Sequence, residues 1–226
     1  MTYPNKYNLS PKEELFIIKK NMIELIYNAG QFESLSTTRL QTEEVIKYNK
    51  ANNVSVNELL TIINLKKGFE LIEKFVKNDM FEFAKSVNRL VAAEDALAPG
   101  EIRTGNVQVP TETQLYIPSI PAQKKVENYF LNLSLKTSSS SATNIALETF
   151  LYITKNQLFW DGNKRTALIV ANKILFEANA GIFSIPEAIF VEFNKLLSNY
   201  YDGNEAEKET LKQFLYKNTI FGIDYE

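Results

Sequence analysis

Apolar residues recur at helical spacing along most of the chain. Leu15, Ile18 and Met22 fall on one helical face, and Ser10 followed by Pro11 is typical of a helix start. Similar patterns continue to the end of the sequence and are interrupted by turn residues. They predict helices over residues 11–29, 43–50, 57–76, 80–93, 123–134, 142–155, 166–179, 187–199 and 206–217.

One stretch departs from the helical pattern. Pro99-Gly100 ends the preceding helix, and Val107 and Val109 then flank a polar residue just after a Gly-Asn pair. Tyr116-Ile117-Pro118 is a second extended piece. These features predict a small β-hairpin near residues 102–118. The fold class is therefore all-α, a helical bundle that carries one small hairpin.

Length and composition favour one domain. The chain has 226 residues, of which 45% are hydrophobic, so it can bury one sizeable core. We expect a single domain over residues 1–226, with an N-terminal helical part at about 1–95 and a second part at about 96–226.

The distribution of charge and apolar residues excludes several classes of partner. The formal net charge is -2, and the sequence has no basic block that could follow a phosphate backbone. No uncharged apolar run approaches the roughly 20 residues that span a bilayer, and the N-terminus lacks the apolar core of a secretory signal. We expect a soluble cytoplasmic protein that binds neither nucleic acid nor membranes.

The chain contains no cysteine and no histidine. The first absence excludes disulfides and thiol catalysis. The second removes the commonest general base and the commonest transition-metal ligand. This chain acting alone therefore cannot use a catalytic mechanism that needs an imidazole group.

The candidate chemistry lies in a loop that leads into a helix, where free backbone amides and the helix dipole favour an anion. Gly162 permits a tight turn, and the Asn163 side chain can donate to a phosphate oxygen. Lys164 and Arg165 supply positive charge, and Asp161 offers the oxygen ligand that Mg²⁺ prefers. The loop therefore favours a magnesium–polyphosphate site, although Asp-Gly-Asn turns and solvated basic pairs are also common without any ligand.

The loop resembles the signature of the Fic/Doc family, whose members share the Fido fold. That signature reads His-x-Phe-x-Asp/Glu-Gly/Ala-Asn-Gly/Lys-Arg. This chain matches it at Phe159 and from Asp161 to Arg165, and departs at the first position, where Gln157 stands in place of His.

Two further segments carry the resemblance. Residues 99–105 and 107–109 are similar to the family's flap, the hairpin that registers a target segment over the site, and the candidate flap contacts are Thr104, Gly105, Val107 and Val109. Residues 27–33 lie where many members have an inhibitory helix with the pattern Ser/Thr-x-x-x-Glu-Gly/Asn. Glu33 fills the Glu position, but Ala29 and Ser34 depart from the pattern.

The resemblance implies AMP transfer from ATP to hydroxyl groups of a target protein, with Mg²⁺ as cofactor. By position, Asp161 would hold Mg²⁺, Asn163 would contact the α-phosphate, and Lys164 and Arg165 would neutralise the other phosphates. Gly162 would belong to the same nucleotide-binding turn. Many members carry another Arg three residues after Arg165, which pairs with the inhibitory Glu. Here that residue is Leu168, so Glu33 lacks its usual partner, and the orientation of the nucleotide is open.

The functional hypotheses differ in the role that they give to Gln157. A carboxamide can orient a hydroxyl but cannot take its proton, and losing a general base costs about 10²–10⁴ in rate. The chain is then a nucleotide-binding protein with impaired or absent AMP transfer, or an active transferase that uses Gln157 to orient the target. A third reading is a non-catalytic module that binds proteins through its flap. The target, the nucleotide base and the formation of a homo-oligomer stay open.

Overall fold

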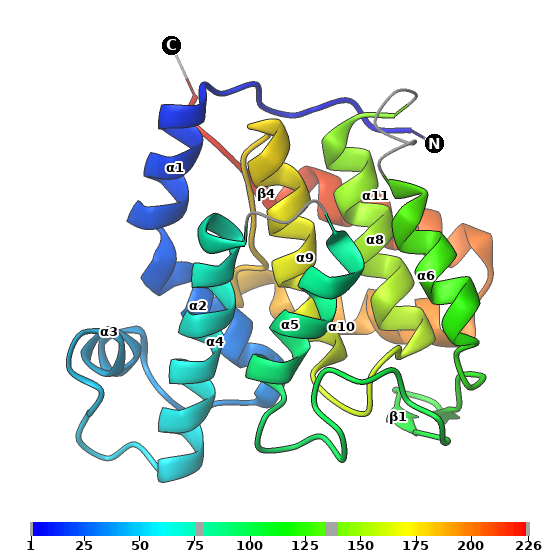
Figure 1. Ribbon diagram of the computed structural model, residues 1–226, viewed down its shortest axis with the longest axis horizontal. Coiled ribbons are helices and arrows are strands. Elements are labelled where there is room, and N and C mark those ends of the chain that lie inside the picture. The colour runs from blue at the N-terminus through cyan, green and yellow to red at the C-terminus, as the bar shows by residue number, and fades with distance from the viewer. Residues whose placement is uncertain (1, 76–78, 134–139, 225–226) are drawn as a thin grey trace.

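The computed structural model describes residues 2–75, 79–133 and 140–224 (Figure 1). The elements in chain order are α1 (Pro11–Lys20), α2 (Met22–Gly30), the 3₁₀ turn η1 (Gln31–Glu33), α3 (Arg39–Tyr48), α4 (Val56–Lys74), α5 (Met80–Val91), β1 (Val109–Pro110), β2 (Leu115–Tyr116), α6 (Gln123–Leu131), α8 (Ala142–Asn156), α9 (Asn163–Ala178), β3 (Ile182–Phe183), α10 (Glu187–Asp202), α11 (Glu205–Asn218) and β4 (Ile220–Phe221). The predicted all-α fold with small hairpins is confirmed.

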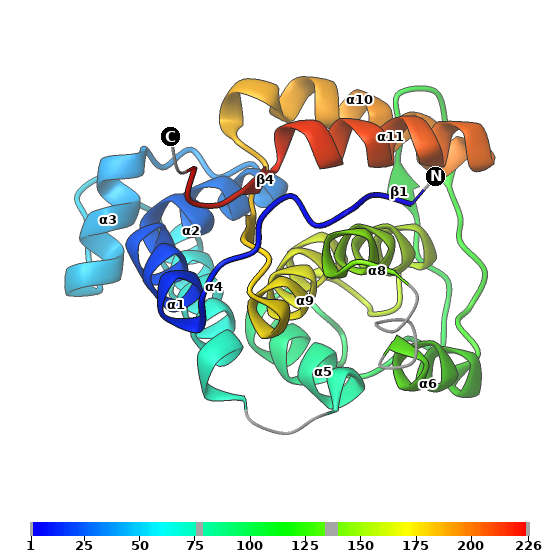
Figure 2. The same cartoon turned by 90° about the horizontal axis from the view of Figure 1, so that it is seen from above.

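Helix α9 lies at the centre of the fold. It is buried on every side from Arg165 to Leu175, as expected for a helix enclosed by other helices. Helix α8 packs along it, and α5 and α4 pack against other faces. Seen from above, α10 and α11 lie on one side of the α8–α9 pair, and α5 and α6 lie on the other (Figure 2). The two ends of the loop between α8 and α9 are therefore fixed by the best-packed part of the core.

The N-terminal helices form a separate layer against α9. Helix α2 packs on α3 and α4, and α4 contacts α9. The single helix predicted for residues 11–29 is wrong, because α1 and α2 are separated at Asn21. The side chain of Asn21 donates to the Ile17 carbonyl at 2.8 Å and leaves the backbone outside helical geometry, which is a known way for Asn to compete with a helix.

Two other helix boundaries differ from the prediction. Helix α3 begins at Arg39 because Thr38 and Gln41 form a capping box, so the predicted start at residue 43 is wrong. Helix α9 begins at Asn163 rather than at residue 166. The basic residues of the loop therefore belong to the first turn of α9. Residue 134, the predicted end of the helix that starts at 123, lies outside the described residues.

The predicted hairpin is smaller than residues 102–118. Only Val109 and Pro110 pair with Tyr116 and Leu115, while Ile102 pairs instead with Phe159 of the loop. A second antiparallel pair, β3 with β4, joins strands on either side of α10 and α11 and was not predicted, because its strands are two residues long and give no alternating pattern.

The buried apolar cluster includes residues from both predicted parts of the chain, such as Leu65 of α4 and Ile169 of α9. The boundary near residue 95 stays a prediction. Among the described residues, no helix combines the length and apolar content that a membrane span requires.

One carboxylate inside this core has no positive partner. Glu14 on α1 is 1% exposed, and its Oε2 accepts a hydrogen bond from the Gly181 amide at 2.9 Å. Its other oxygen, Oε1, has no hydrogen-bond partner among the described residues. Burial raises the pKa of Glu14 to about 7, and the Gly181 amide opposes this only in part. The capping box at the start of α1 is formed by Ser10 and Glu13, so Glu14 has no part in it.

We expect Glu14→Gln to stabilise the protein at pH 8 by up to ~3 kcal/mol and to have little effect at pH 4. A pKa raised by folding means that the contribution of Glu14 to stability is complete below its unfolded pKa and is lost as the pH rises through about 7. Urea unfolding of both proteins at the two pH values measures this. A variant that is no more stable than the native chain at pH 8 would contradict it.

Candidate functional site

The loop between α8 and α9 makes a tight reversal with two residues at positive φ. Gln157 ends α8 at φ 45°, and Gly162 precedes α9 at φ 68°. A Cβ on Gly162 would lie 2.8 Å from Cβ of Ala92, so this glycine also permits close packing against the end of α5. No side chain caps α9. The amides of its first turn therefore remain available to an anion.

Phe159 and Asn163 hold the loop in shape. The Phe159 side chain is fully buried and anchors the loop in the core. Asn163 Oδ1 accepts from the Phe159 amide at 2.9 Å, and Nδ2 donates to the Phe159 carbonyl at 2.9 Å and to Gln157 Oε1 at 3.0 Å. Both amide hydrogens of Asn163 are thus used inside the loop, and its contact with a phosphate stays a prediction.

The Gln157 carboxamide is held from three directions. Nε2 donates to the Thr154 carbonyl at 2.7 Å and to the Tyr201 hydroxyl at 3.3 Å, while Oε1 accepts from Asn163. The side chain is only 9% exposed. Because a carboxamide has two N–H groups, both of its donors are engaged in this conformation.

Arg165 is the best-enclosed cation of the loop, with a side chain 2% exposed. Its Nε lies 2.7 Å from Glu33 Oε1, as an ion pair without hydrogen-bond geometry. The guanidinium also lies 3.3 Å from Asp95 Oδ2 and 3.5 Å from Asp161 Oδ1, and it donates to the Val91 carbonyl. Three carboxylates from separate parts of the chain therefore surround one buried arginine.

The Glu33 contact corrects one expectation. Leu168 is buried in the core, as its apolar character requires, and cannot pair with Glu33. Arg165 takes that place, so Glu33 does have a cationic partner. Burial raises the pKa of Glu33, and Arg165 opposes this rise. The contact of Asp95 with Arg165 was not predicted, because no motif in the sequence around Asp95 relates it to the loop.

Lys164 and Asp161 are the other charged groups of the loop, the first largely buried and the second half exposed. The pKa of Lys164 is lowered by burial, with Glu33 opposing, and its Nζ lies 5.8 Å from the centre of the Phe32 ring. The Asp161 side chain is 49% exposed, and its Oδ1 accepts from the Gly162 amide. Within the described ranges, no cluster of three or more acidic side chains could hold a metal by itself. A metal ion at Asp161 would therefore need oxygens from a ligand or water.

The flap is joined to the loop at its root through Arg103. This side chain is fully buried and donates to the carbonyls of Gln157, Gly105, Pro118, Ser119 and Asn156. Burial lowers the pKa of Arg103. The sequence does not reveal that Arg103 joins the flap to the loop, because its hydrogen-bond acceptors are backbone carbonyls and any residue type can supply these.

The other predicted flap residues lie between this root and the tip. Thr104 is exposed, and Val107 and Val109 are half-buried. Gly105 lies against the indole of Trp160, because a Cβ there would be 2.7 Å from the ring.

The flap tip is fixed on α10. Asp202 accepts hydrogen bonds from Thr111 Oγ1 at 2.8 Å, Thr113 Oγ1 at 3.0 Å and Gln114 Nε2 at 2.9 Å. On the return strand, Tyr116 stacks on Tyr201, whose hydroxyl accepts from Gln157. Flap and loop are thus connected at both ends of the hairpin.

Comparison with known proteins finds a family match over the central part of the chain. Residues 81–175, which contain α5 from its second residue, the flap, α6, α8, the loop and most of α9, match the Fic/DOC family. No match was found among curated protein sequences.

Solved structures agree with this assignment at the level of the fold. A Fic-domain-containing signaling protein from Bacteroides thetaiotaomicron superposes with a TM-score of 0.76 at 17% identity, over 92% of this chain and 86% of that one. Fic-1 from C. elegans gives 0.69 at 14% identity, over 94% and 68%. A Fic family protein from Desulfovibrio desulfuricans gives 0.62 at 15% identity, over 95% and 76%.

We expect Asp202→Ala to release the flap tip and to raise amide exchange rates over residues 109–116 at least about tenfold, because the three hydrogen bonds to one carboxylate disappear together. Hydrogen–deuterium exchange measures this. Glu205→Ala is the matched control, since that neighbouring side chain is 80% exposed and contacts Lys208 rather than the flap. Equal exchange in the Asp202→Ala variant and the native protein would contradict the assignment.

Proposed function

We propose that this protein is a Fic/DOC family member that binds the phosphates of a nucleotide at the loop and transfers AMP poorly or not at all. The uncapped first turn of α9, with Lys164 beside it, supports anion binding. The poor AMP transfer is supported by the hydrogen bonds of Gln157. Both of its N–H groups donate within the protein, and its Oε1 accepts from Asn163. In this conformation the side chain is no base and has no free N–H donor, and only the second lone pair of Oε1 is left to orient a hydroxyl.

The residues present fit ATP and Mg²⁺. The half-exposed Asp161 carboxylate would hold Mg²⁺ together with phosphate oxygens and water, as this ion prefers. Lys164 and the amides of α9 would contact the phosphates. The bound ion would supply neutralisation of phosphate charge. This assignment rests on the chemistry of the donor set and on resemblance to the family.

Glu33 would compete with the nucleotide. Around the loop, Glu33, Asp95 and Asp161 oppose the two cations Lys164 and Arg165, so the local charge is negative when all are ionised. A phosphate can pair with Arg165 only if Glu33 moves away. We therefore propose that Glu33 weakens nucleotide binding through Arg165, the cation that replaces the partner missing at Leu168.

The two other hypotheses from the sequence have less support. Activity through an orienting Gln157 would rest on the second lone pair of Oε1 alone, because both N–H donors are held by Thr154 and Tyr201. Protein capture by the flap alone would not require the charged cluster around Arg165, and it stays a hypothesis.

Glu33→Gln is expected to tighten binding of Mg²⁺–ATP about tenfold, because the neutral side chain no longer competes for Arg165. Calorimetry measures this directly, and Trp160, the single tryptophan of the chain, offers a fluorescence signal within the loop. Asp95→Asn serves as the comparison, since Asp95 is more exposed and its longer contact should produce a smaller gain. Unchanged or weaker binding in Glu33→Gln would refute competition. Absence of binding at millimolar ATP in every variant would refute the proposed function.

Gln157→His should raise AMP transfer by about 10²–10⁴, the usual contribution of a general base. Transfer is measured by incubating the protein with α-labelled ATP and a cell lysate. Gln157→His combined with Asp161→Ala should lose the gain if Asp161 holds the metal. A native chain that already labels targets as fast as Gln157→His would show that Gln157 does not impair transfer.

A further inference from the structure

Lys155 lies at the end of α8, shortly before Gln157, and its ammonium group meets the end of α10. Its Nζ donates to the carbonyls of Tyr200 at 2.5 Å, Tyr201 at 2.7 Å and Gly203 at 3.4 Å. The last carbonyls of a helix have no partner within the helix and carry partial negative charge, so a cation there stabilises the final turn. Lys155 therefore fixes the end of α10 on the end of α8.

Two tyrosine rings also contact the ammonium group of Lys155. Nζ lies 4.8 Å from the centre of the Tyr200 ring and 5.1 Å from the centre of the Tyr116 ring. Burial lowers the pKa of Lys155, and the charges of Asp202 and Glu207 oppose this change. The half-buried ammonium group is thus held by carbonyl oxygens and aromatic faces together.

The backbone of the same residue holds the flap. Tyr116 on β2 donates through its hydroxyl to the Lys155 carbonyl at 3.0 Å, and its ring stacks on Tyr201 with 5.1 Å between the ring centres. The Tyr201 hydroxyl accepts from Gln157 Nε2 at 3.3 Å. The position of Tyr201 therefore depends on Lys155 through its backbone and on Tyr116 through its ring, and its hydroxyl reaches Gln157.

We propose that Lys155 is a positioning residue that sets both the place of the flap and the hydrogen bonding of Gln157. Its side chain fixes the last turn of α10, from which Tyr201 reaches Gln157 and Asp202 reaches the flap tip. Its carbonyl fixes Tyr116 on the return strand. Loss of the ammonium group would let Tyr201 and Asp202 move together, which would loosen the flap and free one N–H group of Gln157.

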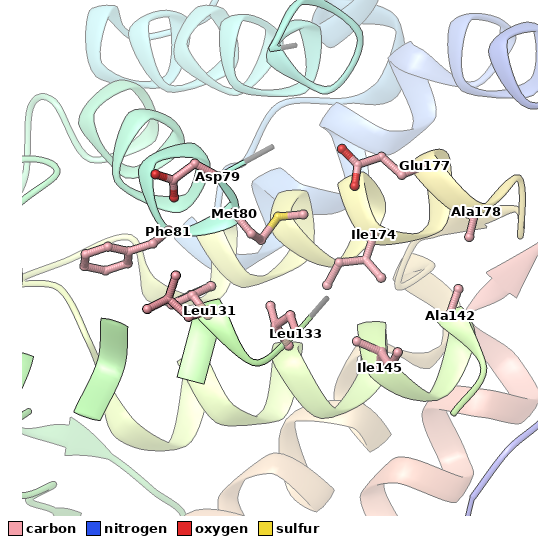
Figure 3. A pocket seen from close by; sticks show the side chains of 11 residues that line it. Asp79, Met80, Phe81, Leu131, Leu133, Ala142, Ile145, Ile174, Glu177 and Ala178 are labelled. Carbon is pink, nitrogen blue, oxygen red and sulfur yellow. The ribbon is translucent and has the colours of Figure 1, made fainter. Parts of the chain in front are cut away.

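A cavity at the opposite end of α8 shows no comparable set of contacts (Figure 3). It has a volume of about 450 Å³ and is lined mostly by apolar side chains. Its two carboxylates are already engaged, since Asp79 accepts from the Glu82 amide and Glu177 pairs with Lys173. Among the described residues, polar contacts from α10 and the flap converge instead on the loop end of α8.

The test replaces the ammonium group in the full chain. Lys155→Met keeps a side chain of similar length, and it should raise amide exchange over residues 109–116 at least about fivefold. It should also shift the side-chain amide signals of Gln157 in heteronuclear NMR spectra, which Gln157→His identifies by their absence. Lys155→Arg keeps the charge and should restore both readouts. Lys195→Met is the matched control, because Lys195 is an exposed lysine on α10, and it should change neither.

AMP transfer by the Gln157→His variant gives a further readout, which rests on the proposed function. Adding Lys155→Met should lower kcat at least about tenfold and leave KM for Mg²⁺–ATP within about twofold, because the phosphate contacts at the start of α9 are untouched. If Gln157→His transfers nothing, the proposed cause of poor transfer is contradicted, while exchange and NMR still decide the role of Lys155.

Tyr116→Phe tests the flap contact even if Lys155→Met does not fold. It keeps the ring that stacks on Tyr201, removes the hydrogen bond to the Lys155 carbonyl, and should raise exchange at residues 115–116 at least about threefold. The proposal is overturned if Lys155→Met leaves flap exchange, the Gln157 signals or kcat of the Gln157→His variant unchanged, or if Lys155→Arg does not restore them. An equal effect of Lys195→Met, or native exchange in Tyr116→Phe, would also overturn it.

Discussion

The ion pairs of one buried arginine connect the separate parts of this site. Arg165 lies in the first turn of the central helix, and its guanidinium contacts Glu33 from the N-terminal layer, Asp95 after α5 and Asp161 in the loop. A buried cation is unfavourable without partners, and so these carboxylates are needed where they are. The same requirement places three negative charges where an anionic ligand would bind. Affinity for a phosphate therefore depends on whether the ligand can replace Glu33 at Arg165.

A second buried arginine is satisfied in a different way. Arg103 donates only to main-chain carbonyls, two of which belong to Asn156 and Gln157 at the end of α8. The root of the flap is thereby fixed to the backbone of Gln157 at the start of the loop. The tip is fixed on α10 by Asp202, so the hairpin is held at both ends. Buried and charge-assisted hydrogen bonds therefore hold the hairpin in a defined position over the loop.

Gln157 shows how a substitution can be accommodated without disturbing the fold. Its carboxamide fits between Thr154, Asn163 and Tyr201 and supplies the donors and acceptor that these groups need. The loop geometry around Phe159 and Asn163 is kept, and with it the uncapped start of α9. The chain thus retains the structural basis for anion binding while lacking a group that can take a proton near neutral pH.

The sequence by itself determined the helices, the order of loop and flap, the burial of Phe159 and the loss of the histidine. These features depend on residues close together in the chain, where spacing, caps and turn residues determine the structure. Only the tertiary structure decided that Glu33 pairs with Arg165, that Asp95 joins them, and that Asp202 holds the flap. These contacts join residues far apart in the sequence. A local sequence pattern cannot predict which distant charged groups come together when the chain folds. The division of residues 11–29 at Asn21 was missed for a related reason, because the competing hydrogen bond to Ile17 is compatible with an unbroken helical pattern.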